Sequence, residues 1–243
     1  MISKFFIEIR NRIFLNVITF LSVFCIIYIY KNFLMSLILI TNTKFLLDMF
    51  DYFIYTSITE IFLVYIKLDF FLTSQIVYFM LFYHIICFFA YGTYKNEYRY
   101  LKYIYFISAC LGILSIFFCN LIFIPFLLNF FLSFQDHSLQ NISFYFEAKI
   151  LDYLLFYINS QLGCFISFQI CVILILFSNY LSKNIKILKN TRKIFYFILL
   201  VFCTLVTPPD IFSQIFLFLV LITGFEMLIF INILKKFIIT VSN

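Results

Sequence analysis

Long apolar segments recur along this chain, and they constrain its fold more than any other feature of the sequence. A transmembrane helix needs about 20 consecutive apolar residues, so runs of this length predict helices that cross a bilayer. Charged residues make up 12% of the chain, about half the share of a soluble domain. The runs are too long, and too poor in two-residue alternation, for an outer-membrane barrel. We therefore predict an all-α polytopic membrane protein.

Charge and turn residues divide the chain into six hydrophobic segments. We predict that they form six transmembrane helices in a single integral membrane domain covering residues 1–243. The first four segments are each long enough to cross a bilayer. The segments are about 13–40, 61–89, 103–132, 150–178, 194–206 and 211–234.

The basic residues predict how these segments are oriented. If the N-terminus lies on the cis side (cytoplasm, matrix or stroma), the cis segments hold 13 of the 17 Lys and Arg residues. The exceptions are Lys31, Lys44, Lys67 and Lys149. Because loops on the inner side of a membrane carry the excess of Lys and Arg, both termini are predicted to lie on the cis side, N-in and C-in.

The fifth segment is short, and a proline pair follows it. Its 13 residues would span about 20 Å as a helix, against about 30 Å for the hydrocarbon core. The next residues read TPPDIFSQIF (207–216). Two prolines stop a helix, and Asp210 can cap the next one, which predicts a tight hairpin between short fifth and sixth spans. Gln214, four residues after Asp210, shares its helix face and can bond to another helix.

Several polar side chains fall inside or at the border of the predicted spans. An ionisable group there costs about 2.5–3.5 kcal/mol on insertion scales and usually faces protein or water. The set therefore predicts a polar concavity, which would serve ion transfer, docking of a partner helix or only bundle specificity. Its members are Glu60, Lys67, Gln169, Gln214 and Glu226, with Asp69 near the first two.

Glu8 and Glu97 are the only carboxylates on the strongly basic cis face. Two interpretations remain open for them. They are local charge partners, as Glu8 and Arg12 at i and i+4 would be, or they are acceptors for a cationic ligand.

The sequence offers little that would support chemistry. It has no nucleotide-binding loop, no set of metal ligands and no nucleophile beside a histidine. Its seven cysteines form no CxxC motif and are expected to pack as small apolar residues. We expect no enzymatic activity, no cofactor and no metal. The net charge of +6 follows from membrane orientation, so we expect no nucleic-acid binding.

Four stretches carry a resemblance to a known family. TPPDIFSQIFLFLVLITGFEMLIF closely resembles the hairpin of spans five and six in TatC, the polytopic core of the twin-arginine protein translocase. AYGTYKNEYRYLK resembles the first cis loop of that family, FFIEIRNRIF its amphipathic N-terminus, and TEIFLVYIKLDFF its entry to span two. The chain departs from the family at Gln169, where many members have glutamate, and in lacking a proline after span one.

The resemblance implies a function. TatC proteins bind twin-arginine signal sequences on the cis face and recruit single-span partners of the TatA and TatB type. A folded cargo then crosses, driven by the proton-motive force. The resemblance also implies that Glu97 and Glu8 accept the arginine pair of the signal sequence, because a planar guanidinium is matched best by a carboxylate. Arg10 and Arg99 would tune this site or face anionic lipid of the bilayer, and the complex would contain several copies of the chain.

The resemblance also gives a role to the polar residues of the fifth and sixth spans. Gln214 and Gln169 would stabilise a partner helix that carries one polar residue. The short hairpin would thin the bilayer locally and so lower the barrier to cargo movement.

One rival is a membrane subunit of a proton-translocating respiratory or ATP-synthase complex. Such subunits usually carry an embedded Arg, Lys or His relay near the bilayer centre. Here every arginine lies in a predicted cis segment, which counts against a relay. A second rival, a haem or metabolite transporter with inverted repeats, is disfavoured because the two halves show no similarity.

The extreme composition, with 39 Phe and only 4 Gly, and the absence of a visible targeting segment favour a mitochondrial inner membrane. A plastid thylakoid or a bacterial plasma membrane are the alternatives.

Overall fold

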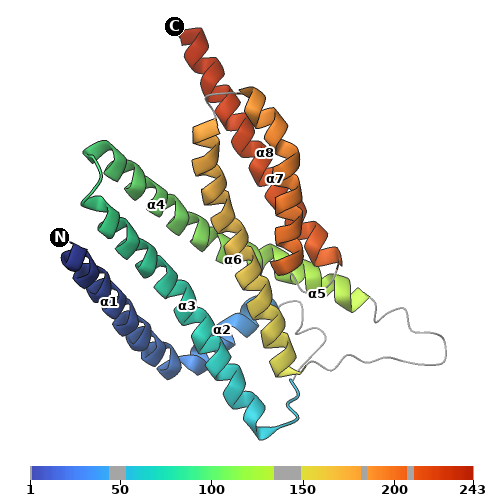
Figure 1. The fold of residues 1–243 in the computed structure, drawn as a ribbon. Helices are drawn as coiled ribbons and strands as arrows, with labels where there is room; N and C mark the ends of the chain where they lie inside the picture. The colour runs from blue at the N-terminus through green and yellow to red at the C-terminus, as the bar shows by residue number, and fades with distance from the viewer. Residues whose placement is uncertain (1, 44–52, 134–148, 182–184, 207–210, 243) are drawn as a thin grey trace. The chain divides into compact units, whose positions relative to one another are not determined.

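The computed structural model describes residues 2–43, 53–133, 149–181, 185–206 and 211–242, and these are almost entirely helical (Figure 1). The only β contact within these ranges is an isolated parallel bridge between Ile54 and Lys149. The predicted all-α fold is therefore confirmed. The elements are α1 (Ile2–Ile29), α2 (Lys31–Thr43), α3 (Ile58–Ala90), α4 (Lys95–Phe118), the π-helix η1 (Cys119–Phe123), α5 (Ile124–Ser133), α6 (Ile150–Leu181), α7 (Ile185–Val206) and α8 (Ile211–Ser242).

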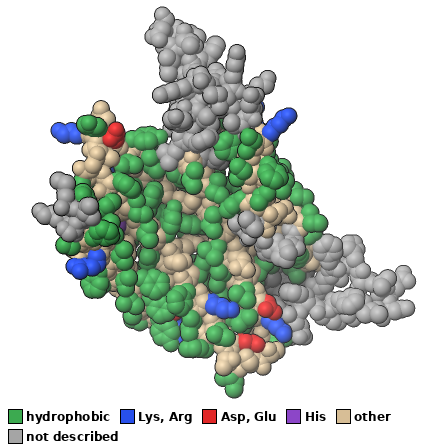
Figure 2. Space-filling model, in the orientation of Figure 1, with side chains coloured by type: hydrophobic (Ala, Val, Ile, Leu, Met, Phe, Trp, Pro, Cys, Tyr) green, Lys and Arg blue, Asp and Glu red, His purple; other side chains and the backbone are tan. Residues whose placement is uncertain are grey.

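Four helical stretches of the described chain are long and apolar enough to cross a membrane: Phe5–Ile29, Ile58–Ala90, Lys95–Ser133 and Ile150–Ile173. A shorter apolar helix covers Ile211–Met227. The face of the molecule in Figure 2 is correspondingly covered by hydrophobic side chains, with few charged ones among them. The four long stretches overlap the first four predicted spans, and the shorter helix lies within the sixth predicted segment.

The helices differ from the predicted segments mainly at their ends. The first predicted span, 13–40, is not one helix, because α1 begins at Ile2 and ends at Ile29, before a break at Tyr30. α7 has 22 residues and begins within a basic stretch. Lys and Arg are good helix formers, so this helix continues beyond its 13-residue apolar part. The proline turn with Asp210 lies outside the described residues.

Pro125 explains why the third predicted span contains a π-helical turn between two α-helices. Proline has no N–H and its ring clashes with the carbonyl four residues earlier, here that of Leu121. The chain forms the π-helix η1 immediately before Pro125, and the Ile124 N–H donates to the carbonyl of Cys119, five residues back. The stretch Lys95–Ser133 is thus a continuous helical run with one wide turn.

The helices form two compact units. Unit 1 comprises Met1–Ala109 and Asn129–Ile158. Within it α1 packs along α3, and the rings of Phe24 and Phe70 approach to 5.1 Å between centroids. The beginning of α6 joins this unit through Tyr157, whose ring meets Phe71 edge-on at 6.3 Å.

Unit 2 comprises Cys110–Leu128 and Asn159–Asn243. Within it α7 packs against α8. One face of α8 is buried at every fourth residue: Leu217, Leu221, Phe225 and Ile229 are each at most 5% exposed. This spacing is the stripe expected of a helix that packs on one side only.

Candidate functional site

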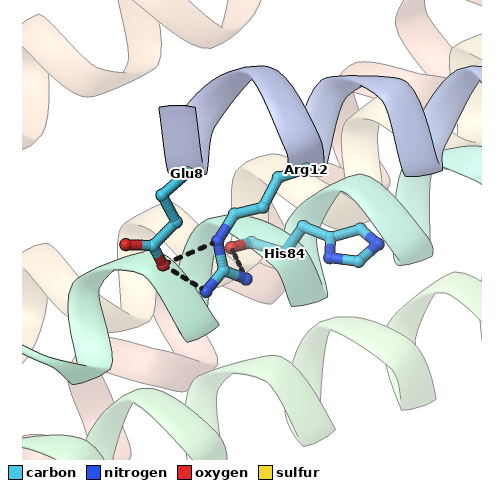
Figure 3. A network of polar contacts seen from close by, with 3 residues as sticks. All are labelled: Glu8, Arg12 and His84. Carbon is cyan, nitrogen blue, oxygen red and sulfur yellow. Dashed lines mark hydrogen bonds and ion pairs between the residues drawn. The ribbon is translucent and has the colours of Figure 1, made fainter. Parts of the chain in front are cut away.

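Glu8 and Arg12 form an ion pair near the start of α1 (Figure 3). Arg12 donates from Nη2 to Glu8 Oε1 at 2.6 Å and from Nε to the same oxygen at 3.1 Å. Its Nη1 donates to the backbone carbonyl of His84 on α3 at 3.4 Å. The interpretation of Glu8 as a local charge partner of Arg12 is confirmed. Its second oxygen, Oε2, has no hydrogen-bond partner in the described part of the chain.

A cleft of about 570 Å³ lies against this ion pair within unit 1. Its walls come from α1 and from the last two turns of α3 with Tyr91 beyond them. We call it the Glu8 cleft. It is lined by Glu8, Asn11, Arg12, Leu15, Tyr83, His84, Cys87, Ala90 and Tyr91. A carboxylate, a guanidinium and two phenols are among its polar groups.

Glu97 lies on the first turn of α4, shortly after the end of α3. Its Oε2 accepts a hydrogen bond from the backbone N–H of Tyr94 at 3.0 Å, and Tyr94 contributes its carbonyl to the first turn of the helix. This is the reach-back half of a capping box. The side chain is exposed, and among the described residues no cation pairs with it.

Arg10 and Arg99 are exposed on α1 and α4. Neither forms an ion pair with a described residue. Both side chains are thus available to solvent, lipid headgroups or a ligand, and neither holds the fold together.

Glu226 on α8 bonds to two residues of α7 within unit 2. The Tyr196 hydroxyl donates a hydrogen bond to its Oε1, and Arg192 Nη2 lies 3.6 Å from its Oε2. Arg192 and Tyr196 are one turn apart on α7, so both reach the same carboxylate. The partners of Glu226 were not predicted, although Arg192 and Glu226 lie at nearly equal distances along the chain from the predicted turn at 207–210.

The other predicted intramembrane polar residues are divided between the two units. Glu60 bonds the Thr56 N–H at 2.8 Å and the Thr56 hydroxyl at 2.6 Å, not Lys67. Glu60 and Lys67 belong to unit 1, whereas Gln169, Gln214 and Glu226 belong to unit 2. Gln169 and Gln214 are half-buried. A single polar row of all five remains a prediction.

Long apolar helices with charged groups gathered at few positions define a polytopic helical membrane protein. A sequence model of the family "Sec-independent protein translocase protein (TatC)" matches residues 4–219. The chain belongs to this TatC family, and the resemblance drawn from its motifs is confirmed. Because the family consists of protein-translocase components, which are transporters, the expectation that the chain is not an enzyme is also confirmed.

Three relatives illustrate the match. The Sec-independent protein translocase protein TatC of Rickettsia prowazekii is 30% identical over 225 residues, 90% of this chain and 87% of the relative. An uncharacterized tatC-like protein, ymf16, of Nephroselmis olivacea is 31% identical over 94% of this chain and 92% of its own length. The protein of the same name from Reclinomonas americana is 29% identical over 95% of this chain and 86% of its own length.

Two solved structures share the fold. Both are crystal structures of the twin-arginine translocase receptor TatC, one of them in the detergent DDM, with TM-scores of 0.70 and 0.72 at 22% identity. They cover 94% and 96% of this chain and 99% of each solved chain.

Proposed function

We propose that this protein is the core subunit of a twin-arginine translocase and its signal-peptide receptor. In this role it binds a twin-arginine signal through Glu97 and Glu8. It then takes part in moving folded proteins across an energy-transducing membrane with the proton-motive force. Membership of the TatC family supports this proposal over the alternative of a subunit in a proton-translocating respiratory or ATP-synthase complex.

The state of the Glu97 carboxylate carries the proposal. One of its oxygens caps α4, and the other has no hydrogen-bond partner among the described residues. The side chain is exposed, so an incoming guanidinium can reach it without breaking an ion pair. A charge-assisted hydrogen bond of this kind is about twice as strong as a neutral one.

Glu8 supplies the second carboxylate on different terms. It already binds Arg12, so a signal arginine must share it through Oε2 or displace Arg12. The Glu8 cleft provides the space for that approach, and Tyr91 in its wall lies six residues before Glu97 in the sequence. We infer that Glu97 makes the larger contribution to binding and that Arg10 and Arg99 tune the field around the pair.

A binding measurement in lipid nanodiscs tests this assignment. A labelled twin-arginine signal peptide should bind the Glu97→Gln variant at least about tenfold more weakly than wild type, a loss of about 1.4 kcal/mol. Glu60→Gln is the matched control, because Glu60 caps the start of α3 by a similar backbone contact. Equal loss in both variants, or no loss in Glu97→Gln, would remove the receptor role from Glu97.

We further propose that single-span partners of the TatA and TatB type bind unit 2 beside Gln214 and Gln169, and that several copies of this chain share one complex. A half-buried glutamine on a membrane helix can bond to a polar group on a partner helix. Asp210, which we expect to contribute there, lies outside the described residues. Unchanged partner crosslinking in a Gln214→Leu variant would count against this site.

The full topology belongs to the same proposal: six spans, both termini on the cis side, in a mitochondrial inner membrane. Support comes from the distribution of Lys and Arg and from the composition. Labelling of single cysteines at positions 97 and 57 from each side of sealed vesicles tests it, because α3 separates the two positions. Labelling of both positions from the same side would contradict the orientation.

A further inference from the structure

Asp69 is a carboxylate enclosed inside unit 1. It lies in α3, is 0% exposed, and neither of its oxygens has a hydrogen-bond partner among the described residues. Its neighbours Leu68 and Thr73 on the same helix are also 0% exposed, and the Thr73 hydroxyl donates to backbone carbonyls rather than to the carboxylate. A carboxylate in such a place is stable only if it is neutral or if a cation pairs with it.

One cation lies beside the turn of α3 that precedes Asp69. It is the ammonium of Lys31, the first residue of α2. The ammonium of Lys31 does not bond to the carboxylate. It lies over two phenol rings, 4.1 Å from the centroid of Tyr28 and 5.2 Å from that of Tyr65. Tyr65 is one turn before Asp69 on α3, so the Lys31 ammonium lies one helical turn from the position of the carboxylate.

The remaining titratable groups near this buried side of α3 do not compete for the carboxylate's proton. α1 contributes Tyr28, whose ring lies under the Lys31 ammonium, and α6 contributes Tyr157, whose ring meets Phe71. Tyrosines are neutral at physiological pH. Lys67, two residues before Asp69 on α3, is half-buried and forms no ion pair with a described residue.

We propose that Asp69 is a proton-binding site within unit 1, with Lys31 as its movable counter-ion. In the protonated state Asp69 is a neutral acid and the Lys31 ammonium stays over Tyr28 and Tyr65, as in this structure. When the carboxyl group releases its proton to solvent, the ammonium leaves the rings and pairs with the carboxylate. One proton is exchanged, and Lys31 keeps its charge throughout.

The exchange has a mechanical consequence because of where Lys31 lies. The break at Tyr30 separates α1 from α2, and Lys31 follows that break. The ion pair would therefore fasten the start of α2 to α3 at Asp69, whereas protonation would return the ammonium to the rings of Tyr28 and Tyr65. The inference does not depend on the proposed receptor function.

Infrared spectroscopy of the protein in bilayers, with aspartate ¹³C-labelled at its side-chain carboxyl, tests the site. We expect a labelled carboxylic-acid band in wild type that is missing in Asp69→Glu, which retains an unlabelled acid, and that converts to carboxylate as the pH rises. Lys31→Gln should move the midpoint of this conversion upwards by about one pH unit or more, a tenfold gain in proton affinity. Lys67→Gln, the matched control, should leave the midpoint in place.

Two results would overturn the proposal. The absence at every pH of an acid band that Asp69→Glu removes would mean that Asp69 is always ionised. A midpoint that Lys31→Gln leaves unchanged, or that both lysine variants move equally, would take the counter-ion role from Lys31.

A distance measurement tests the mechanical consequence separately. Spin labels at the exposed positions Phe33 on α2 and Phe62 on α3 should give a narrower distance distribution above the midpoint in wild type and no change in Lys31→Gln. An equally broad distribution on both sides of the midpoint in wild type would contradict the fastening of α2 to α3.

Discussion

The hydroxyl of Tyr196 on α7 donates a hydrogen bond to Glu226 on α8, and this contact joins the two helices on either side of residues 207–210. Arg192 adds a longer, half-exposed ion pair at 3.6 Å to the same carboxylate. The helix α8 begins within the family motif TPPDIFSQ. Among its described residues it has one carboxylate, Glu226, which is already bonded to α7 within unit 2.

We expect Tyr196→Phe to lower the stability of the protein more than Arg192→Gln. A hydrogen bond to a charged acceptor contributes about 1.5–3 kcal/mol, and the lower end applies because the site is partly exposed. A half-exposed ion pair contributes about 0–1 kcal/mol. Thermal unfolding in detergent micelles measures both, with the exposed Tyr103→Phe as the control. A larger loss for Arg192→Gln would reverse this ranking of the two contacts.

Arg12→Gln should destabilise the packing of α1 on α3 by about 1–2 kcal/mol. The change removes two hydrogen bonds to Glu8 and one to the His84 carbonyl, and only 19% of the Arg12 side chain is exposed. Arg10→Gln, two residues away on the exposed side of the same helix, should leave stability within about 0.5 kcal/mol. Thermal unfolding midpoints of the two variants measure this difference. Equal effects would mean that the ion pair does not support this interface.

Gly224→Ala should be tolerated and should stabilise α8. A Cβ built at this position would meet Cys171 Sγ at 3.8 Å, an ordinary van der Waals distance, and alanine is about 0.5–1 kcal/mol more favourable than glycine within a helix. The thermal midpoint should rise. A fall would show that α8 approaches another helix or a partner more closely at Gly224 than unit 2 alone requires.

The helical class of this protein follows from its sequence because apolar runs of this length leave the backbone no other way to satisfy its hydrogen bonds in lipid. The ends of the helices follow less well. Hydropathy marks where apolar residues stop, whereas a helix stops where its backbone bonds stop, so α7 extends into the basic residues from Ile185 onwards. The break at Tyr30 could not be predicted from the sequence, because no proline or glycine lies near it.

The sequence indicated which residues belong to the candidate site, but it did not indicate most of the contacts between them. The i and i+4 spacing of Glu8 and Arg12 indicates their ion pair, and the structure contains it. The capping contact of Glu97 depends on where α4 begins, which hydropathy does not give. The enclosure of Asp69 depends on how α3 packs within unit 1, because one sequence does not reveal which helix face is buried.

The most direct test of the receptor role is site-specific photocrosslinking from position 97. The probe is a precursor with a twin-arginine signal, compared with the same precursor carrying two lysines. The protein is inserted in its membrane, and a second crosslinker at position 60 serves as the control. Our account predicts a crosslink from position 97 that depends on the arginine pair and none from position 60. Equal labelling of both precursors from position 97, or of neither, would contradict it and leave Glu97 as a helix cap alone.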